Sequence, residues 1–258
     1  MSLSSNSMFS LTGKRALVTG SSRGIGFGIA DALGAAGAEL LLNGRDQQAL
    51  GAAAAKLAEK GYSVKGLAFD VTSEESVEDA IAHAETEIGH IDILVNNAGM
   101  QHRAPLETWP LEKFEQVMST NLTSAFLVSR AVVKGMIERK SGKIINICSV
   151  LSNFARASVA PYSASKAAIA NLTRGMAVDW AKYNINVNGI APGYIATELN
   201  EALLANPEFN AWVEKRTPMG RWGQPAELGG AAVFLSSDAA TFVNGHILYV
   251  DGAFTATV

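Results

Sequence analysis

The chain has 258 residues, of which 48% are apolar, and this is enough to form the core of a single α/β domain. Its net charge is only −3 and its charged residues are scattered, which excludes the strongly basic surface of a nucleic-acid-binding or membrane-surface protein. One cysteine, Cys148, and the lack of a basic-then-apolar leader or a long apolar run predict a soluble cytoplasmic protein without an internal disulfide. The four histidines have no metal-ligand spacing, so we expect no metal site.

Strand-like and helix-like segments alternate along the chain. Residues 1–10 are Ser-rich and aperiodic, and we expect a flexible tail there. Short apolar runs predict seven strands, at residues 15–19, 38–43, 64–69, 91–95, 144–148, 185–190 and 246–250. Helices are predicted at residues 27–36, 46–60, 73–89 and 110–140, and from Tyr162 onward. The pattern predicts one doubly wound (Rossmann-type) α/β domain over residues 11–258, with a parallel sheet of about seven strands and ligands beyond their carboxyl ends.

Residues 194–223 interrupt this alternation. The segment is polar and irregular for its length, with Pro207 and Pro218 inside it. Long irregular segments in compact domains are often lids over a site. We therefore expect a flexible substrate lid here.

A glycine-rich loop follows the first predicted strand. Gly20, Gly24 and Gly26 have the spacing Gly-x-x-x-Gly-x-Gly. Glycines allow the backbone to approach a pyrophosphate closely, which then lies at the N-terminus of the following helix. The alternative is an ordinary glycine turn, but a position between strand and helix favours dinucleotide binding.

The end of the second predicted strand indicates which dinucleotide binds. Where an NAD enzyme has an acidic residue for the ribose 2′-hydroxyl, this chain has Gly44-Arg45. Guanidinium groups suit phosphate oxygens, so Arg45 and Arg23 would hold a 2′-phosphate. In the alternative, Arg45 is solvated and Asp46 makes the contact. We expect NADP(H) to be preferred, with NAD(H) still possible.

Ser149, Tyr162 and Lys166 form a candidate catalytic set. Ser149 lies where the fifth predicted strand leaves the sheet, and Tyr162 and Lys166 are one helical turn apart on one face. Lowering a phenol pKa by about two units requires about 2.7 kcal/mol, and an ammonium within roughly 4 Å supplies about 4 kcal/mol at an effective dielectric of 20. Lys166 alone could therefore make Tyr162 a base. The alternative is a chance Tyr-x-x-x-Lys on an exposed helix. Cys148 alternates to the other side of the strand and is predicted to be a core thiol.

Together with Asn96-Asn-Ala-Gly99 and Pro192-Gly193-x-x-x-Thr197, these motifs resemble those of the short-chain dehydrogenase/reductase family over residues 11–258. The resemblance implies that Tyr162 is the acid/base and that Lys166 lowers its pKa and holds the nicotinamide ribose. It further implies that Ser149 orients the reacting oxygen and that Asn121 completes a proton relay through water. It also implies a homotetramer. The implied cofactor contacts are Gly20, Ser22, Arg23, Gly24, Ile25, Gly26, Arg45, Asp70, Val71, Asn97, Ala98, Gly99, Tyr162, Lys166, Pro192, Gly193, Ile195 and Thr197.

Within that family, the segments around the expected pocket are most similar to the gluconate 5-dehydrogenase group. These segments are residues 147–150, 173–176, 188–194, 215–218, 221–223 and 242–246. The similarity implies hydride transfer between NADP(H) and a secondary alcohol or ketone of a sugar acid, most specifically D-gluconate and 5-keto-D-gluconate. The other interpretations are a reductase of another carbonyl, such as a 3-oxoacyl thioester or a deoxy sugar acid, and a non-catalytic NADP-binding sensor.

A sugar acid needs a cationic partner for its carboxylate, and guanidinium provides paired charge-assisted hydrogen bonds. Arg103, just past the fourth predicted strand, and Arg156, between Ser149 and Tyr162, are the candidates that the topology places nearest. In the alternative interpretation both are surface residues. With Ser149 and Tyr162 they make up the expected substrate contacts.

Overall fold

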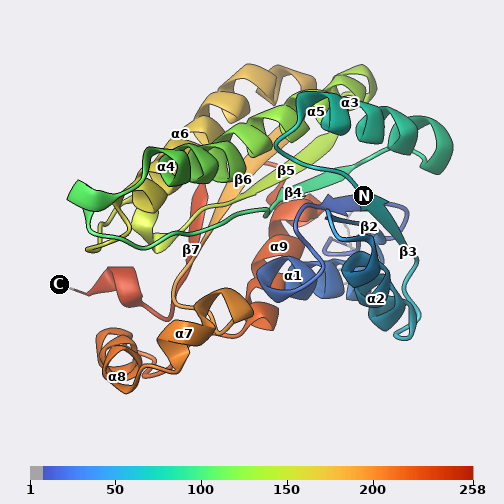
Figure 1. Cartoon of the computed structure of the whole chain (residues 1–258). Coiled ribbons are helices and arrows are strands. Elements are labelled where there is room, and N and C mark those ends of the chain that lie inside the picture. Colours follow the sequence, from blue (N-terminus) through green and yellow to red (C-terminus); the bar gives the residue numbers. More distant parts are fainter. Residues whose placement is uncertain (1–7, 258) are drawn as a thin grey trace.

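Seven short apolar runs pair in the computed structural model into one parallel sheet (Figure 1). The structure describes residues 8–257. The strands are β1 (Arg15–Val18), β2 (Glu39–Gly44), β3 (Val64–Ala68), β4 (Ile93–Asn96), β5 (Gly142–Ile147), β6 (Ile185–Pro192) and β7 (Ile247–Val250). Their order in the sheet is β3-β2-β1-β4-β5-β6-β7. Since the connections reverse direction between β1 and β4, the crevice for a ligand lies at the carboxyl ends of these two strands.

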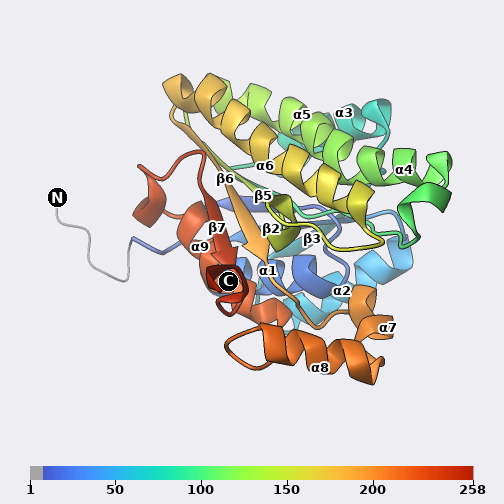
Figure 2. The same ribbon diagram turned by 90° about the vertical axis from the view of Figure 1, so that its left-hand side faces the viewer.

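Helices cover both faces of the sheet (Figures 1 and 2). One layer contains α1 (Gly24–Ala35), α2 (Gln47–Ala58) and α9 (Gly229–Ser236). The other contains α3 (Glu74–His83), α5 (Ser124–Arg139) and α6 (Ala160–Trp180), with α4 (Leu111–Met118) leading into α5. Two short helices after β6, α7 (Glu201–Leu204) and α8 (Pro207–Arg216), lie together below the sheet in the view of Figure 1. The buried side chains between these layers make the core, which holds the strand ends in fixed positions.

The fold class and all seven predicted strands are confirmed, with ends that shift by one or two residues. The helical region predicted over residues 110–140 is confirmed, and within it a π-helical turn at Ser119–Thr123 separates α4 from α5. The prediction that residues 194–223 are irregular is wrong for α7 and α8, whereas the substrate lid predicted there stays a prediction. Asn206 accepts a hydrogen bond from the backbone N–H of Phe209 at 3.0 Å and Pro207 occupies the first turn, so α8 has a well-formed start.

The predicted tail lies mostly outside the described residues, which begin at Met8. Met8 is already bound to the rest of the domain, because its carbonyl accepts a hydrogen bond from the backbone N–H of Ala239 at 3.1 Å. Between residues 8 and 257 no helix is both long and apolar enough to cross a membrane. The same residues contain no cluster of three or more metal-ligating side chains.

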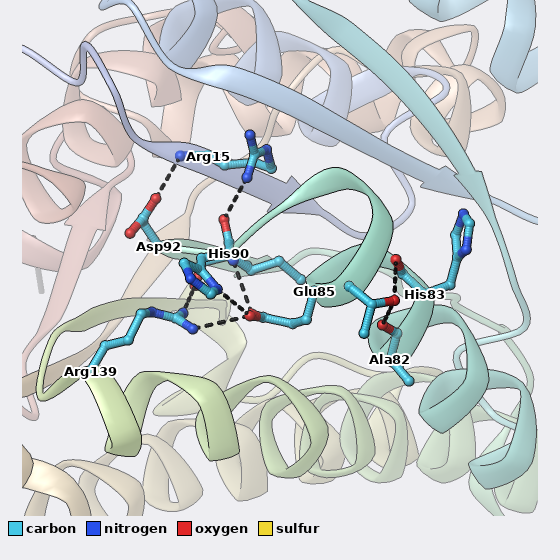
Figure 3. A network of polar contacts seen from close by, with 9 residues as sticks. Arg15, Ala82, His83, Glu85, His90, Asp92 and Arg139 are labelled. Carbon is cyan, nitrogen blue, oxygen red and sulfur yellow. Dashed lines mark hydrogen bonds and ion pairs between the residues drawn. The ribbon is translucent and has the colours of Figure 1, made fainter.

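A polar network lies at the amino-terminal ends of the strands, opposite the ligand crevice (Figure 3). Glu85, in a π-helical turn that extends α3, accepts hydrogen bonds from the backbone N–H of Ile91 at 3.0 Å and from Arg139 at 3.0 Å, and its other contact is His90 Nδ1 at 2.9 Å. Arg15 at the start of β1 donates to the His90 carbonyl at 3.0 Å. Burial raises the pKa of Glu85, but these hydrogen bonds and the charge of Arg139 outweigh it, so the pKa lies below its ordinary value.

We expect Glu85→Gln to lower the free energy of unfolding at pH 7 by about 1–2 kcal/mol, because it removes a charged acceptor of three contacts. A carboxylate with a lowered pKa contributes stability above its unfolded pKa, and this is lost as pH falls through the folded pKa. The difference between variant and parent should therefore shrink as pH falls below 4.5, the ordinary value. Urea unfolding at several pH values measures this difference in the free energy of unfolding between variant and parent. Glu59→Gln, at an exposed position, is the control, and equal effects of the two substitutions would contradict the account.

Candidate active site

The glycine loop is held against the end of β4 by two side chains. Thr19 Oγ1 accepts hydrogen bonds from the backbone N–H groups of Asn97 and Ala98, both at 3.0 Å. Asn97 Nδ2 donates to the carbonyls of Thr19 and Gly20, both at 2.9 Å. Gly20 has a φ of 61°, which favours glycine, and a Cβ at Gly26 would lie 2.4 Å from Asn97 Nδ2. Asn97 therefore braces the loop, and its contact with a cofactor stays a prediction.

Asn43 holds the same loop from the other side, a role that the sequence analysis does not predict. Its Oδ1 accepts from the backbone N–H of Gly20 at 3.2 Å. Its Nδ2 donates to the carbonyls of Leu67 at 3.3 Å and Phe69 at 3.1 Å, at the end of β3. The only sequence signal is a polar residue at the end of an apolar strand. One buried amide therefore ties the loop to the ends of β2 and β3.

A cavity of about 1470 Å³ opens in front of the loop. All the predicted cofactor residues line it except Gly26, which packs behind the loop. The predicted catalytic residues Ser149, Tyr162 and Lys166 line it too, whereas Asn121 does not.

The start of α1 faces this cavity with its backbone donors available. Arg23 caps α1 without a side-chain hydrogen bond, and the first turn contains no acidic residue. The free N–H groups and the positive end of the helix suit an anion. The glycine cradle, the cavity and this helix start therefore fit the pyrophosphate and the two nucleosides of a dinucleotide.

Arg45, Asp70 and Arg23 all line the cavity, and Arg45 lies close enough to Asp70 for its charge to act on that carboxylate. Asp70 accepts hydrogen bonds from the backbone N–H of Thr72 at 2.9 Å and from its hydroxyl at 2.7 Å. Burial raises the pKa of Asp70, but these bonds and the charge of Arg45 outweigh it and hold the pKa below its ordinary value. Asp70 is therefore ionised and oriented, and Arg45 is exposed enough to bind a phosphate.

Lys166 is buried beside Tyr162, one turn further along α6. Its Nζ donates to the carbonyl of Ile147, the last residue of β5, at 2.6 Å and lies 5.8 Å from the centroid of the Tyr162 ring. Burial lowers the pKa of Lys166 to about 8. The amine is thus still mainly protonated at pH 7.

The prediction that Lys166 alone lowers the pKa of Tyr162 is not met in this structure. Burial raises the pKa of the phenol, and a hydrogen bond with Ser149 and the charge of Arg103 offset this only in part. The sequence spacing places the ammonium correctly but does not show how strongly the phenol is desolvated. Tyr162 therefore holds its proton at neutral pH.

Asn121 links α6 to the loop after β4. It lies in the π-helical turn, a feature often found at functional sites. Its Oδ1 accepts from the backbone N–H of Met100 at 2.8 Å, and its Nδ2 donates to the Met100 carbonyl and to Ser165 Oγ, both at 3.0 Å. Ser165 Oγ in turn donates to the carbonyl of Tyr162 at 2.7 Å. The side chain therefore fixes the start of α6, and its part in a water relay stays a prediction.

Ser149 leaves β5 in an extended conformation and starts a short turn. Its backbone N–H donates to Ser152 Oγ at 3.2 Å, and Ser152 Oγ donates to the carbonyl of Lys166 at 2.7 Å. These contacts set Ser149 and α6 in one rigid arrangement.

Cys148 is buried, and burial raises the pKa of its thiol to about 11, which confirms the predicted core thiol.

Arg103 and Arg156 lie close enough for their charges to interact, and both act on Tyr194, while Arg103 is also near Tyr162. Neither lines the dinucleotide cavity, but burial and the neighbouring charge of Arg156 lower the pKa of Arg103, while Tyr194 and Tyr162 oppose this. The Nε atoms of both arginines are buried without a hydrogen-bond partner among residues 8–257. Both side chains are half-buried, which disfavours the alternative of two ordinary surface residues, and their contact with a substrate stays a prediction. Tyr194, which the sequence analysis gives no role, completes this group.

Several known proteins are similar to this chain over almost its whole length. A family model described as enoyl-(acyl carrier protein) reductase matches residues 20–255. The chain is 52% identical to the gluconate 5-dehydrogenase of Gluconobacter oxydans (strain 621H), over 97% of this chain and 98% of the relative. It is 49% identical to the 5-keto-D-gluconate 5-reductase of Escherichia coli (strain K12), over 98% of this chain and 100% of the relative.

The fold agrees equally well with a solved structure. A gluconate 5-dehydrogenase from Burkholderia cenocepacia J2315, crystallised in complex with NADP and tartrate, has a TM-score of 0.97 and 48% identity. The match covers 99% of this chain and 100% of that one.

The glycine cradle predicts unequal effects of two Gly→Ala changes. In Gly26→Ala the new Cβ would lie 2.4 Å from Asn97 Nδ2 and 2.5 Å from the Gly20 carbonyl, so we expect NADPH binding to weaken by about tenfold or more. Gly51→Ala in α2 is the control, because its Cβ would meet nothing within 4 Å. Fluorescence titration with NADPH measures both, and equal affinities would contradict the proposed cradle.

The position of Tyr162 predicts loss of chemistry without loss of binding. Tyr162→Phe should keep the NADPH affinity and lower kcat by about 10²- to 10⁴-fold, because it removes the group that transfers the proton. Tyr183→Phe, beyond the far end of α6, is the matched control. Activity of Tyr162→Phe within tenfold of the parent would exclude Tyr162 as the acid/base.

Proposed function

Because the chain belongs to the short-chain dehydrogenase/reductase family, we propose that it is an oxidoreductase that interconverts D-gluconate and 5-keto-D-gluconate with NADP(H). The observation that carries the choice of substrate is the pair Arg103 and Arg156 beside Tyr162, whose Nε atoms lack a partner among residues 8–257. A hexonate has a carboxylate for these groups and a secondary alcohol for the catalytic residues. The relatives named for gluconate or its 5-keto form support this choice.

When bound, NADP⁺ accepts the hydride that leaves C5 of the hexonate, and NADPH returns it in the reverse direction. Tyr162 takes the proton of the C5 hydroxyl during oxidation and donates it to the carbonyl oxygen during reduction. Because burial keeps the phenol protonated, Tyr162 is ready to act as the acid in reduction. In oxidation Tyr162 must first lose its proton, and the ammonium of Lys166, 5.8 Å from the ring centroid, would then stabilise the phenolate.

Ser149 and Asn121 position the reacting groups. Ser149 lines the cavity next to Tyr162, where its hydroxyl can bond the reacting oxygen and the phenol together. Asn121 fixes the Tyr162 carbonyl through Ser165, and a water held near this turn would connect Lys166 to solvent. Ser149 would therefore donate a hydrogen bond to the reacting oxygen as negative charge develops on it, and Asn121 would help to connect the proton of Tyr162 to solvent.

The other candidate substrates differ in charge near the reacting carbon. A 3-oxoacyl thioester presents an acyl chain there, for which Arg103 and Arg156 are poor partners. A deoxy sugar acid bears the same carboxylate as gluconate, so the two arginines favour it as the second candidate. A non-catalytic sensor would have no use for Ser149, Tyr162 and Lys166 in one arrangement, and turnover would exclude it.

NADP(H) is the cofactor that the second strand favours. Gly44 stands at the end of β2 where an acidic residue would select the free 2′-hydroxyl, and Arg45 and Arg23 line the same cavity. The solved relative from Burkholderia cenocepacia contains NADP. NAD(H) remains possible as a weaker cofactor.

A homotetramer in the cytoplasm fits the surface and the single thiol. Phe242 is fully exposed and Phe126 on α5 is 42% exposed, and subunit contacts would cover such residues. A lone buried thiol suits a reducing compartment. Mass photometry should give four times the mass of the chain, and a monomer alone would contradict the assembly.

The cofactor assignment predicts the effect of Gly44→Asp combined with Arg45→Ile. The nearest atoms to a Cβ at Gly44 are 3.8 Å away, so the site has room for the new carboxylate. We expect the ratio of kcat/KM for NADP to that for NAD to fall by about 10- to 100-fold, since charged hydrogen bonds are lost and a 2′-hydroxyl acceptor is gained. Gly44→Ala is the control for the backbone change. A parent enzyme that already prefers NAD would contradict the assignment.

The substrate assignment predicts a charge-dependent effect of Arg103→Ala. The KM for D-gluconate should rise by about 10- to 100-fold, whereas the KM for a neutral polyol such as sorbitol should change little, because only the acid loses a partner. Arg103→Lys, which keeps the charge but not the paired donors, should have an intermediate effect. Equal changes for acid and polyol would refute Arg103 as the carboxylate partner.

A further inference from the structure

Arg156 is held by a residue from a distant part of the chain. It lies in the loop between β5 and α6, and its Cζ is 4.9 Å from the centroid of the Phe209 ring on α8. Its Nε is buried without a hydrogen-bond partner among residues 8–257. A guanidinium over an aromatic face is attracted by the ring quadrupole, and this contact restricts a side chain that otherwise has many rotamers.

The Phe209 ring is itself fixed by a cluster of aromatic side chains around Tyr194. The ring centroids of Tyr194 and Phe209 are 5.8 Å apart and those of Tyr194 and Trp222 are 5.5 Å apart, both in edge-to-face arrangements. Trp222 Nε1 donates to Asn210 Oδ1, next to Phe209 on α8, at 2.7 Å. Trp212 and Phe254 complete the cluster, with centroids 5.7 Å and 5.5 Å from that of Tyr194. The cluster therefore gives α8 a defined position over Arg156.

This contact leaves the hydrogen-bonding edge of Arg156 available. A cation–π contact of the guanidinium with the Phe209 ring uses none of its N–H donors, so these stay free to bind a substrate. Arg103 and the Tyr194 phenol are the charged and polar neighbours of this group, because the charges of Arg103 and Arg156 both act on the ionisation of Tyr194. An acidic group of a substrate between Arg103 and Arg156 would thus meet oriented donors from both sides.

We propose that Phe209 is a positioning residue that determines specificity for anionic substrates, by holding Arg156 in the orientation that binds the substrate's carboxylate. The inference rests on the proposed function and extends it to α8, a helix outside the catalytic group. It assigns α8 a part in selecting acidic over neutral substrates, beyond covering the site.

The first test compares two substitutions of Phe209. Phe209→Leu keeps apolar bulk but removes the aromatic face, whereas Phe209→Tyr keeps the face and is the matched control. The dissociation constant of D-gluconate from the enzyme–NADPH complex, in which no hydride can be transferred, should rise by about 3- to 30-fold in Phe209→Leu, the range that a lost cation–π contact implies. Phe209→Tyr should stay near the parent. The KM for sorbitol and the NADPH affinity should not change in either variant.

Replacement of Phe209 by pentafluorophenylalanine separates the electrostatic contact from packing. The fluorinated ring keeps the shape of phenylalanine but reverses the sign of the quadrupole, so it tests the proposal even where Phe209→Leu fails to fold. We expect gluconate binding to weaken as in Phe209→Leu. Unchanged binding with the fluorinated ring would overturn the proposal.

A double-mutant cycle with Arg156→Gln tests whether Phe209 acts through Arg156. Once Arg156 is replaced, Phe209→Leu should have no further effect on kcat/KM for D-gluconate, because the two residues form one unit. Additive effects would overturn the proposal while leaving the proposed function intact. Absence of hexonate turnover by the parent enzyme would instead refute the proposed function itself, so the two failures are distinguishable.

Discussion

The hydrogen bond from Lys166 Nζ to the carbonyl of Ile147 joins the catalytic helix to the sheet, and the rest of the site depends on it. It places an ammonium inside the protein next to the half-buried phenol of Tyr162, at the point where β5 ends. Burial disfavours the charge and lowers the pKa of Lys166 to about 8. The folded protein therefore loses the hydration free energy of this ammonium. Such a cost is common where a protein prepares a group for chemistry rather than for stability.

Asparagine side chains connect the segments that meet at the carboxyl edge of the sheet. Asn43 and Asn97 hold the glycine loop from two sides, and Asn121 joins the loop after β4 to the start of α6. An amide provides both donors and an acceptor on a short stem, so it can replace the backbone pairing that loops lack. The cofactor cradle and the catalytic helix are thereby positioned by the same kind of interaction, and Ser152 adds a further link through the Lys166 carbonyl.

The sequence predicts the features that depend on local pattern and motif order. Apolar runs locate the seven strands, and the glycine loop, Ser149, Tyr162 and Lys166 follow from spacing because carboxyl ends of parallel strands share one edge. Features that depend on tertiary packing are not predictable in this way. The stacking of Arg156 on Phe209 joins residues far apart in the chain, and the raised pKa of Tyr162 depends on burial. The π-helical turn at Asn121 has no pattern of its own in the sequence.

The residues of this site support hydride transfer between NADP(H) and a sugar acid. The most direct measurement mixes the purified protein with NADP⁺ and, in separate reactions, D-gluconate, sorbitol and a 3-hydroxyacyl thioester, and follows the absorbance of NADPH. The account predicts NADPH formation with D-gluconate well above that with sorbitol, with 5-keto-D-gluconate as the product identified by nuclear magnetic resonance. Turnover of the thioester without turnover of any hexonate would contradict it.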